Sequence, residues 1–451
     1  MKNRHLLAFL LGLAPILAQL LTPSATAATP SDPTVTLTAE LDYAQLSAEG
    51  NDTAILKVSL LPAHLRYNND RPPLNLAIVL DRSGSMGGEK IEMAKRAVRR
   101  AFQTLQPNDY VSIVAYNNTA RTLLPLTQVR HIHNPRAYID RLHADGGTAI
   151  YAGVNLGAAQ LRPALDDSSG INRILLLSDG LANEGPSDVR DFQLLGKSLS
   201  REGITVSTIG LGLGYNEDLM AGLSAAGQGN VYFVETANDL PRIFDSELGD
   251  ASSIVAQNAV IEIECLHGFE PIRIIGRDGQ VRGNRVTLDI KHLYAGQEKF
   301  ALIEVRNPGG AAHSTQDIAT ITTRYQDIDS DKTYAVNKTA TTTFAPNREQ
   351  KEKSVNIEVQ RQVVYNFIAE AQDEAVALAD QGKLPAATAA LSELDDWIAT
   401  HNTVWQDAEI ERKRSELEST TSTLEKQGLD NKSRKEMRSS SYQTRSQQKS
   451  Y

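Results

Sequence analysis

The spacing of apolar and polar positions divides the chain into regions of different periodicity. Residues 34–60 alternate apolar and polar side chains, which predicts half-buried β-strands. From Leu74 onward, continuous apolar runs alternate with stretches of helical period, and such runs are typical of strands buried on both faces. Two of them, 74–80 and 173–178, are each followed directly by an aspartate. This order of strands and helices predicts a doubly wound, mostly parallel α/β sheet.

The alternating pattern returns after residue 255. It predicts four antiparallel strands, at 260–265, 285–290, 300–305 and 318–323. Asp278-Gly279 is expected to form a hairpin turn between two of them. We expect these strands and those of 34–60 to form one flanking β-sandwich, into which the α/β domain is inserted. The hypothesis rests on pattern alone, and it fails if the two flanks lie in separate sheets.

The period becomes helical from Val355 onward. One apolar seam lies within 364–378 and a second within 384–398, with Gly382 and Pro385 placed between them as a helix end and a helix start. A third helix is indicated by apolar residues at seven-residue spacing, namely Ile410, Leu417 and Leu424. We expect a helical hairpin with a third helix, packed within the chain; a coiled coil with a partner is the alternative. Residues 429–451 are rich in Ser, Gln, Lys and Arg, which predicts a disordered basic tail.

The N-terminus has the pattern of a secretory signal peptide. Basic residues at Lys2 and Arg4 precede the apolar stretch Leu6–Leu21, and small residues offer a cleavage site after Ala27. The expected location is therefore periplasmic or secreted, with an uncleaved membrane anchor as the alternative and no transmembrane segment after cleavage. The net charge of −9 argues against nucleic acid as a partner. The single cysteine, Cys265, allows no intrachain disulfide.

Together these patterns predict six consecutive segments. They are a signal peptide (1–27), the N-terminal strands of the sandwich (28–71), the α/β domain (72–251), the remaining sandwich strands (252–346), the helical segment (352–428) and the basic tail (429–451).

Oxygen-bearing side chains follow the two apolar strands that end in aspartate. Asp81, Ser83 and Ser85 can converge on one face of an extended segment because they are spaced two residues apart. Asp179 follows the other strand, and Thr148 comes after two glycines just before an expected helix. If the two strands are neighbours where the strand order reverses, all three segments meet at one edge of the sheet. Carboxylates and hydroxyls are hard ligands, which suit Mg²⁺, Mn²⁺ or Ca²⁺ better than zinc.

These elements resemble the metal-ion-dependent adhesion site of von Willebrand factor type A (VWA) domains. The resemblance rests on D-R-S-G-S at 81–85, G-G-T at 146–148 and S-D-G at 178–180, and it covers about residues 73–250. It implies a metal site in which Ser83 and Ser85 bind the ion directly, while Thr148, Asp81 and Asp179 bind it directly or through water. The family leaves one coordination position open for a Glu or Asp of a protein partner. The flanking regions resemble those of exported bacterial VWA proteins.

The resemblance implies a binding protein rather than an enzyme. We expect metal-dependent protein binding, with Mg²⁺ as the first choice of ion, in adhesion or in envelope assembly; the sequence does not choose between them, and it does not indicate the oligomeric state. One alternative is a metal-dependent hydrolase or phosphatase that uses the same carboxylates. However, an aspartyl-phosphate enzyme places a second aspartate where Ser83 stands, and no phosphate-binding G-x-x-x-x-G-K-[ST] is present. The second alternative is a membrane-anchored regulatory or scaffold protein of an envelope complex.

Two other candidate metal sites are disfavoured. Asp327-x-Asp329-x-Asp331 begins like a calcium loop, but lysines stand where the loop needs its glycine and its final glutamate, so we expect a polar hairpin turn. The histidines have no cysteine or carboxylate at ligand spacing, and we expect loop and helix-surface positions for His131, His133 and His143.

Overall fold

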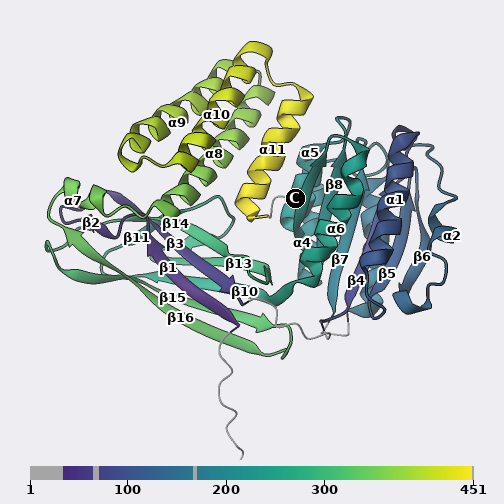
Figure 1. The fold of residues 1–451 in the computed structure, drawn as a ribbon, viewed down its shortest axis with the longest axis horizontal. Coiled ribbons are helices and arrows are strands. Elements are labelled where there is room, and N and C mark those ends of the chain that lie inside the picture. The colour runs from purple at the N-terminus through teal and green to yellow at the C-terminus, as the bar shows by residue number, and fades with distance from the viewer. Residues whose placement is uncertain (1–33, 64–70, 166–169, 449–451) are drawn as a thin grey trace, which may run out of the picture. The chain divides into compact units, whose positions relative to one another are not determined.

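The computed structural model describes residues 34–63, 71–165 and 170–448, and Figure 1 shows its elements. The predicted signal peptide lies outside the described residues. The predicted fold class is confirmed: a mostly parallel sheet with helices on both faces is accompanied by two antiparallel sheets and C-terminal helices. None of the described helices is both long and apolar enough to cross a membrane.

The α/β domain is built on a six-stranded sheet with the order β6-β5-β4-β7-β8-β9. All neighbouring pairs are parallel except β5 and β6. The strands are β4 (Leu74–Asp81), β5 (Tyr110–Tyr116), β6 (Ala120–Gln128), β7 (Ile171–Ser178), β8 (Ile204–Leu211) and β9 (Gln228–Val234). The residues of β4 and β7 are all buried, as their continuous apolar runs predict.

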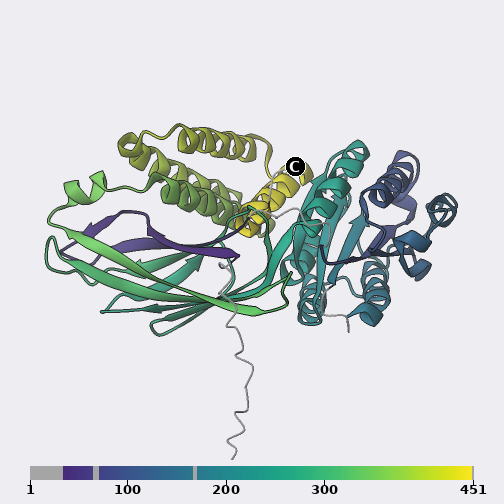
Figure 2. The same ribbon diagram turned by 60° about the horizontal axis from the view of Figure 1, so that its bottom comes forward.

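Helices cover both faces of this sheet (Figures 1 and 2). One face packs against α1 (Glu89–Thr104) and α6 (Leu240–Ser252). The other packs against α3 (Ile150–Leu161), α4 (Val189–Arg201) and α5 (Glu217–Ala226). A short helix, α2 (Arg136–Ile139), lies in the connection between β6 and α3. The sheet thus has a core on each side, which leaves its strand ends as the edges where loops can gather.

The flanking strands form two sheets that share one core, and all of their pairs are antiparallel except the short parallel pair of β2 with β16. One sheet has the order β1-β3-β14-β11 and the other β12-β13-β10-β15-β16-β2, and apolar residues from both meet in a single cluster. The first consists of β1 (Val35–Leu41), β3 (Thr53–Pro62), β14 (Lys299–Arg306) and β11 (Glu270–Ile275); the second consists of β12 (Gln280–Arg282), β13 (Arg285–Tyr294), β10 (Ile254–Cys265), β15 (Thr315–Asp327), β16 (Thr333–Ala345) and β2 (Gln45–Ser47). Since residues 53–60 of β3 pair with all of β14, strands from before and after the α/β domain share one sheet, and the insertion hypothesis is confirmed.

The predicted hairpin at Asp278-Gly279 is wrong. These residues connect β11 to β12, which belong to different sheets. The turn that joins two paired strands is at Gly283, between β12 and β13, where a φ of +59° suits glycine. The Asp327–Asp331 segment does form a hairpin turn, between β15 and β16, and Asp327 accepts hydrogen bonds from the Ser330 backbone and hydroxyl.

The C-terminal helices pack within the chain, as predicted. They are α7 (Arg348–Lys353), α8 (Ile357–Asp380), α9 (Leu384–Trp405), α10 (Ala408–Gln427) and α11 (Asn431–Ser446). The expected seams of α8, α9 and α10 meet in one apolar cluster. Helix α8 also packs on the sandwich, where Val359 and Val363 join Ile55 and Leu302.

The prediction of a disordered tail at 429–451 is wrong for the described part of that segment. Residues 431–446 form α11, which has only Met437 in the helical core. Composition predicted disorder because so few side chains could be buried, but α11 is held by polar and ionic contacts that pattern does not reveal.

A fully buried ion pair joins the α/β domain to the sandwich. Arg173 of β7 donates to Glu247 of α6 at 2.6 Å and to the Tyr294 hydroxyl of β13 at 3.1 Å, and both charged side chains are 0% exposed. Burial alone would raise the pKa of Glu247, but the Arg173 charge and hydrogen bonds from neighbours such as Tyr232 bring it below its ordinary value. The stabilisation that this carboxylate provides is therefore complete above its unfolded pKa and is lost as the pH falls through the lower folded value.

Replacing Arg173 with methionine should lower the free energy of unfolding by about 3–5 kcal/mol, because the Glu247 carboxylate is then buried without a partner. Urea unfolding followed by circular dichroism measures the loss. Arg173→Met combined with Glu247→Gln should recover part of it, because glutamine carries no charge and still offers an acceptor to Asn230 and Tyr232. Arg162→Met, which breaks a partly exposed pair with Glu202, is the control and should cost less than about 1 kcal/mol. Equal losses for the two single variants would contradict this account.

Candidate metal centre

The two aspartates of the predicted site lie side by side at one edge of the sheet. Asp81 is the last residue of β4, and Asp179 follows the last residue of β7. The two strands are parallel neighbours in register from Leu74 and Ile171 onward, so their carboxyl ends coincide. The chain leaves β4 towards β5 on one side and reaches β7 on the other, which makes this the point where the strand order reverses.

Asp81 is buried and held by neighbours on both of its oxygens. Its Oδ1 accepts a hydrogen bond from the Ser83 backbone at 2.8 Å, and its Oδ2 accepts one from the Ser178 hydroxyl at 2.6 Å. Burial raises the pKa of Asp81, the hydrogen bonds from Ser178 and Ser83 oppose that shift, and the Asp179 charge adds to it. A bound cation would favour the ionised form.

Three oxygens form a continuous chain across the two loops. The Ser83 and Ser85 hydroxyls are 3.0 Å apart, and the Ser85 hydroxyl donates to Asp179 Oδ1 at 2.6 Å. Adjacent oxygens around an octahedral Mg²⁺ with bonds of about 2.1 Å are about 3 Å apart. The spacing of these side chains is thus close to that of neighbouring ligands on one ion. Ser85 is exposed whereas Ser83 and Asp179 are buried, so the chain of oxygens reaches solvent at Ser85.

Thr148 is brought to the same place by the loop before α3. The Gly146 carbonyl accepts a hydrogen bond from Gly84 at 3.0 Å, and Asn183 accepts one from the Thr148 backbone at 2.7 Å. A methyl group on Gly180 would lie 3.3 Å from the Ser85 hydroxyl and 3.4 Å from that of Thr148. The structure therefore brings all five predicted residues together.

The donor set suits a hard divalent cation. Two carboxylates and three hydroxyls supply oxygen alone, as Mg²⁺, Mn²⁺ and Ca²⁺ prefer. Among the described residues no group of three or more His, Cys, Asp or Glu side chains is arranged to hold a metal, so a site here depends on its hydroxyls. His131, His133 and His143 are exposed, at the surface positions expected of them.

Sequence reasoning missed Lys90. Its ammonium group forms an ion pair with Asp179 Oδ2, while its side chain is 36% exposed. Lys90 lies in the first turn of α1, where a positive charge opposes the helix dipole. A lysine at the start of a helix that follows a ligand loop was the signal that could have revealed this contact.

Other polar residues around the site hold the loops that carry the candidate ligands. These contacts were not predicted from the sequence either. Arg82 forms an ion pair with Asp145, and Asn117 donates to the same carboxylate at 2.9 Å. Asn118 accepts from the Gly147 backbone at 3.0 Å. These contacts join the segment after β4, the segment after β5 and the loop before α3.

Comparisons with known proteins identify the same α/β domain. Residues 75–246 match the model of the von Willebrand factor type A domain. The chain is 32% identical to YfbK of Escherichia coli over 212 residues, and 33% identical to sll0103 of Synechocystis sp. over 194 residues. These matches cover 47% and 43% of this chain, but only 36% and 45% of the relatives' own lengths.

Solved structures share the fold over most of the chain. A von Willebrand factor type A protein from Catenulispora acidiphila superposes with a TM-score of 0.67 at 17% identity, covering 90% of this chain and 96% of that one. The ArnB paralog VWA2 from Sulfolobus acidocaldarius gives a TM-score of 0.58 at 19% identity, covering 91% of this chain and 98% of that one. At such low identity the likeness shows the fold alone. The chain contains a von Willebrand factor type A domain, and it is related to the bacterial proteins YfbK and sll0103.

Proposed function

We propose that this protein binds a protein partner through a divalent cation, preferentially Mg²⁺, held by Asp81, Ser83, Ser85, Thr148 and Asp179. A Glu or Asp of the partner completes the coordination of the ion. The observation that carries the proposal is the chain of oxygens from Ser83 through Ser85 to Asp179, spaced like metal ligands and open to solvent at Ser85.

Charge explains why such a site would recognise an acidic residue only when metal is bound. Without metal, the site contains two aspartates and one ammonium group, that of Lys90, so its net charge is negative. This negative charge repels the carboxylate of a partner. A divalent cation reverses the sign of that charge and adds an electrophile. The ion is thus both the attachment point and the switch, and the chain's own residues orient it and hold its ligands in place.

The same contacts argue against hydrolysis or phosphoryl transfer by these carboxylates. Asp81 is 0% exposed, and each of its oxygens already accepts a hydrogen bond, so it cannot attack a substrate without leaving Ser83 and Ser178. Asp179 is 1% exposed and is engaged by Ser85 and Lys90. We therefore propose a binding role rather than an enzymatic one, and we place it outside the cytoplasm on the strength of the predicted signal peptide, with adhesion and envelope assembly as the two settings.

Mg²⁺ should bind the purified protein at one site, and Asp179→Asn should weaken that binding at least about 10-fold, because a charged ligand is lost. Isothermal titration calorimetry measures the affinity. Asp289→Asn, at an exposed position on the sandwich strand β13, is the matched control and should leave it unchanged. Equal affinities for the two variants would exclude this site.

Pull-down of the mature protein in Mg²⁺ and in EDTA, with partners identified by mass spectrometry, tests recognition itself. A partner should be retained in Mg²⁺ by the wild type and by Asp289→Asn, and lost both in EDTA and with Asp179→Asn. Identical partner lists under both conditions would remove the metal from the mechanism. Mg²⁺-dependent phosphatase turnover abolished by Asp81→Ala would instead establish the enzymatic alternative.

Lys90→Met should change metal binding and partner binding in opposite directions. Removing the ammonium group leaves Asp179 without its ionic partner, so Mg²⁺ should bind about 3- to 10-fold more tightly. The metal-loaded site then carries less positive charge, and the affinity for the acidic partner should fall by a similar factor. Calorimetry with Mg²⁺ and with the recovered partner measures both. A loss of both affinities would mean that Lys90 supports the site rather than balancing its charge.

A further inference from the structure

The C-terminal helix α11 is charged where a packing helix is normally apolar. Its 16 residues include six charged side chains, and Met437 is its only contribution to the helical core. An isolated helix of this length is marginal in water, so α11 depends on what it contacts. Figure 1 shows it, in yellow, beside α5 and α8.

The basic side chains of α11 bind the first turn of α5 and the loop before it. Lys435 is 4% exposed and donates to Glu217 at 2.6 Å and to the Tyr215 carbonyl at 2.9 Å, with its ammonium group 4.6 Å from the centre of the Tyr215 ring. Arg434 forms ion pairs with both Glu217 and Asp218. The start of α5 is therefore held by two cations from the far end of the chain.

The end of the same segment covers the exposed edge of the α/β sheet. β9 is the last strand in that sheet, and an edge strand has backbone groups without a strand partner. Gln448 accepts a hydrogen bond from the Val231 backbone at 3.0 Å and donates to the Val231 carbonyl at 3.1 Å. Tyr442 donates to the Gly229 carbonyl at 2.7 Å. Side chains of this segment thus take the place of a neighbouring strand.

The adjacent glutamine makes the same pair of bonds to the sandwich. Gln447 accepts from the Phe300 backbone and donates to the Phe300 carbonyl, both at 2.9 Å. Its φ of +52° is uncommon outside glycine, and this left-handed residue ends α11. Two consecutive glutamines therefore fasten the α/β domain and the sandwich to one helix end.

The loop that α11 holds also touches the metal centre. A methyl group on Gly214 would lie 2.8 Å from the Asp179 carbonyl oxygen, and one on Gly212 would lie 3.9 Å from the Lys90 ammonium. Tyr215 is the next residue after Gly214, and its ring lies against the ammonium group of Lys435. The loop that α11 contacts therefore lies next to a predicted metal ligand and near its counterion Lys90.

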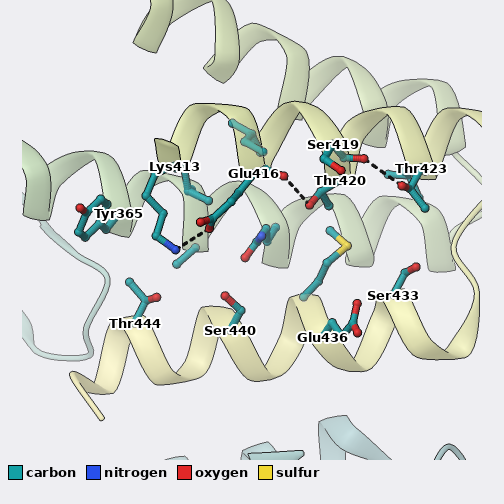
Figure 3. A pocket seen from close by; sticks show the side chains of 16 residues that line it. Tyr365, Lys413, Glu416, Ser419, Thr420, Thr423, Ser433, Glu436, Ser440 and Thr444 are labelled. Carbon is teal, nitrogen blue, oxygen red and sulfur yellow. Dashed lines mark hydrogen bonds and ion pairs between the residues drawn. The ribbon is translucent and has the colours of Figure 1, made fainter. Parts of the chain in front are cut away.

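On its other side α11 does not pack closely against α10. A groove of about 340 Å³ separates the two helices, and Figure 3 shows hydroxyl-bearing side chains from both lining it. Those from α10 include Ser419, Thr420 and Thr423, and those from α11 include Ser433 and Ser440. The attachment of α11 thus rests mainly on ion pairs and hydrogen bonds, which salt and water weaken far more than they weaken an apolar core.

We propose that α11, together with Gln447 and Gln448, is a releasable latch whose docking pre-organises the metal centre. Docked, it fixes the loop beside Asp179 and closes the β9 edge; released, it loosens both. The proposal rests on the proposed function, because it names a regulation of the same site. Since linkage is reciprocal, a latch that favours metal binding must itself be stabilised by the metal.

Hydrogen–deuterium exchange of the full chain, read by mass spectrometry, tests release independently of metal binding. Raising NaCl from about 0.1 to about 1 M should speed exchange in α11 and β9 together, by about 10-fold or more. The double variant Arg434→Gln/Arg438→Gln should give the same pattern at low salt, because Arg438 also binds Asp218, at 2.9 Å. Arg412→Gln, which breaks an exposed pair within α10, is the matched control and should behave as the wild type. Gln448→Ala should expose β9 without a change of charge.

Calorimetry on the same proteins tests the coupling. The double variant should bind Mg²⁺ about 3- to 10-fold more weakly than the wild type or Arg412→Gln, and Mg²⁺ should slow exchange in α11 of the wild type. The latch is refuted if α11 stays protected in the double variant at high salt. The coupling alone is refuted if α11 is released but Mg²⁺ binds equally well. If no protein binds Mg²⁺, the proposed function and the coupling both fail, while release is still measured.

Discussion

The parallel pairing of β4 with β7 is the constraint on which the candidate site depends. It aligns the carboxyl ends of two buried strands, so that Asp81 and Asp179 reach the same edge. The hydrogen bond between Ser178 and Asp81 at this edge joins residues that are 97 positions apart in the sequence. The loop after β4 then brings Ser83 and Ser85 to this edge, and the loop before α3 brings Thr148. Because the strands are buried on both faces, a shift in this register would move the aspartates and expose apolar core at once.

Much of the fold and the place where the five candidate residues meet could be predicted from the sequence, because apolar periods locate the strands and the resemblance to VWA domains adds Thr148 and Asp179. Continuous apolar runs located β4 and β7, and a spacing of two residues placed Asp81, Ser83 and Ser85 on one face. The contacts that were missed depend on three-dimensional proximity instead. The ion pair of Lys90 with Asp179 and the docking of α11 involve polar side chains whose partners lie far away in the sequence. The turn at Gly283 was missed because several glycines in this region could have formed it. The apolar pattern of a sequence indicates which residues are buried, but it does not indicate which charged and polar side chains will pair.

Buried and exposed ion pairs contribute differently to this structure. The pair of Arg173 and Glu247 is fully buried and joins β7 and α6, and Arg173 also binds Tyr294 of the sandwich. The pairs of Arg434 and Arg438 with the start of α5 are partly exposed, so they can be screened and exchanged. The candidate metal site lies between these extremes, because Asp179 is buried, Lys90 is partly exposed and Ser85 is exposed. Such a gradient suits a site that must be rigid on its inner side and available on its outer side.

The most direct test of the central claim is anomalous diffraction from crystals of the protein soaked in Mn²⁺, which replaces Mg²⁺ at hard oxygen sites. The account predicts one strong peak within about 2.3 Å of the Ser83 and Ser85 hydroxyl oxygens, at the edge shared by β4 and β7, with one coordination position filled by solvent or by a carboxylate of a neighbouring molecule. A peak elsewhere, or no peak while Lys90 keeps its contact with Asp179, would contradict it.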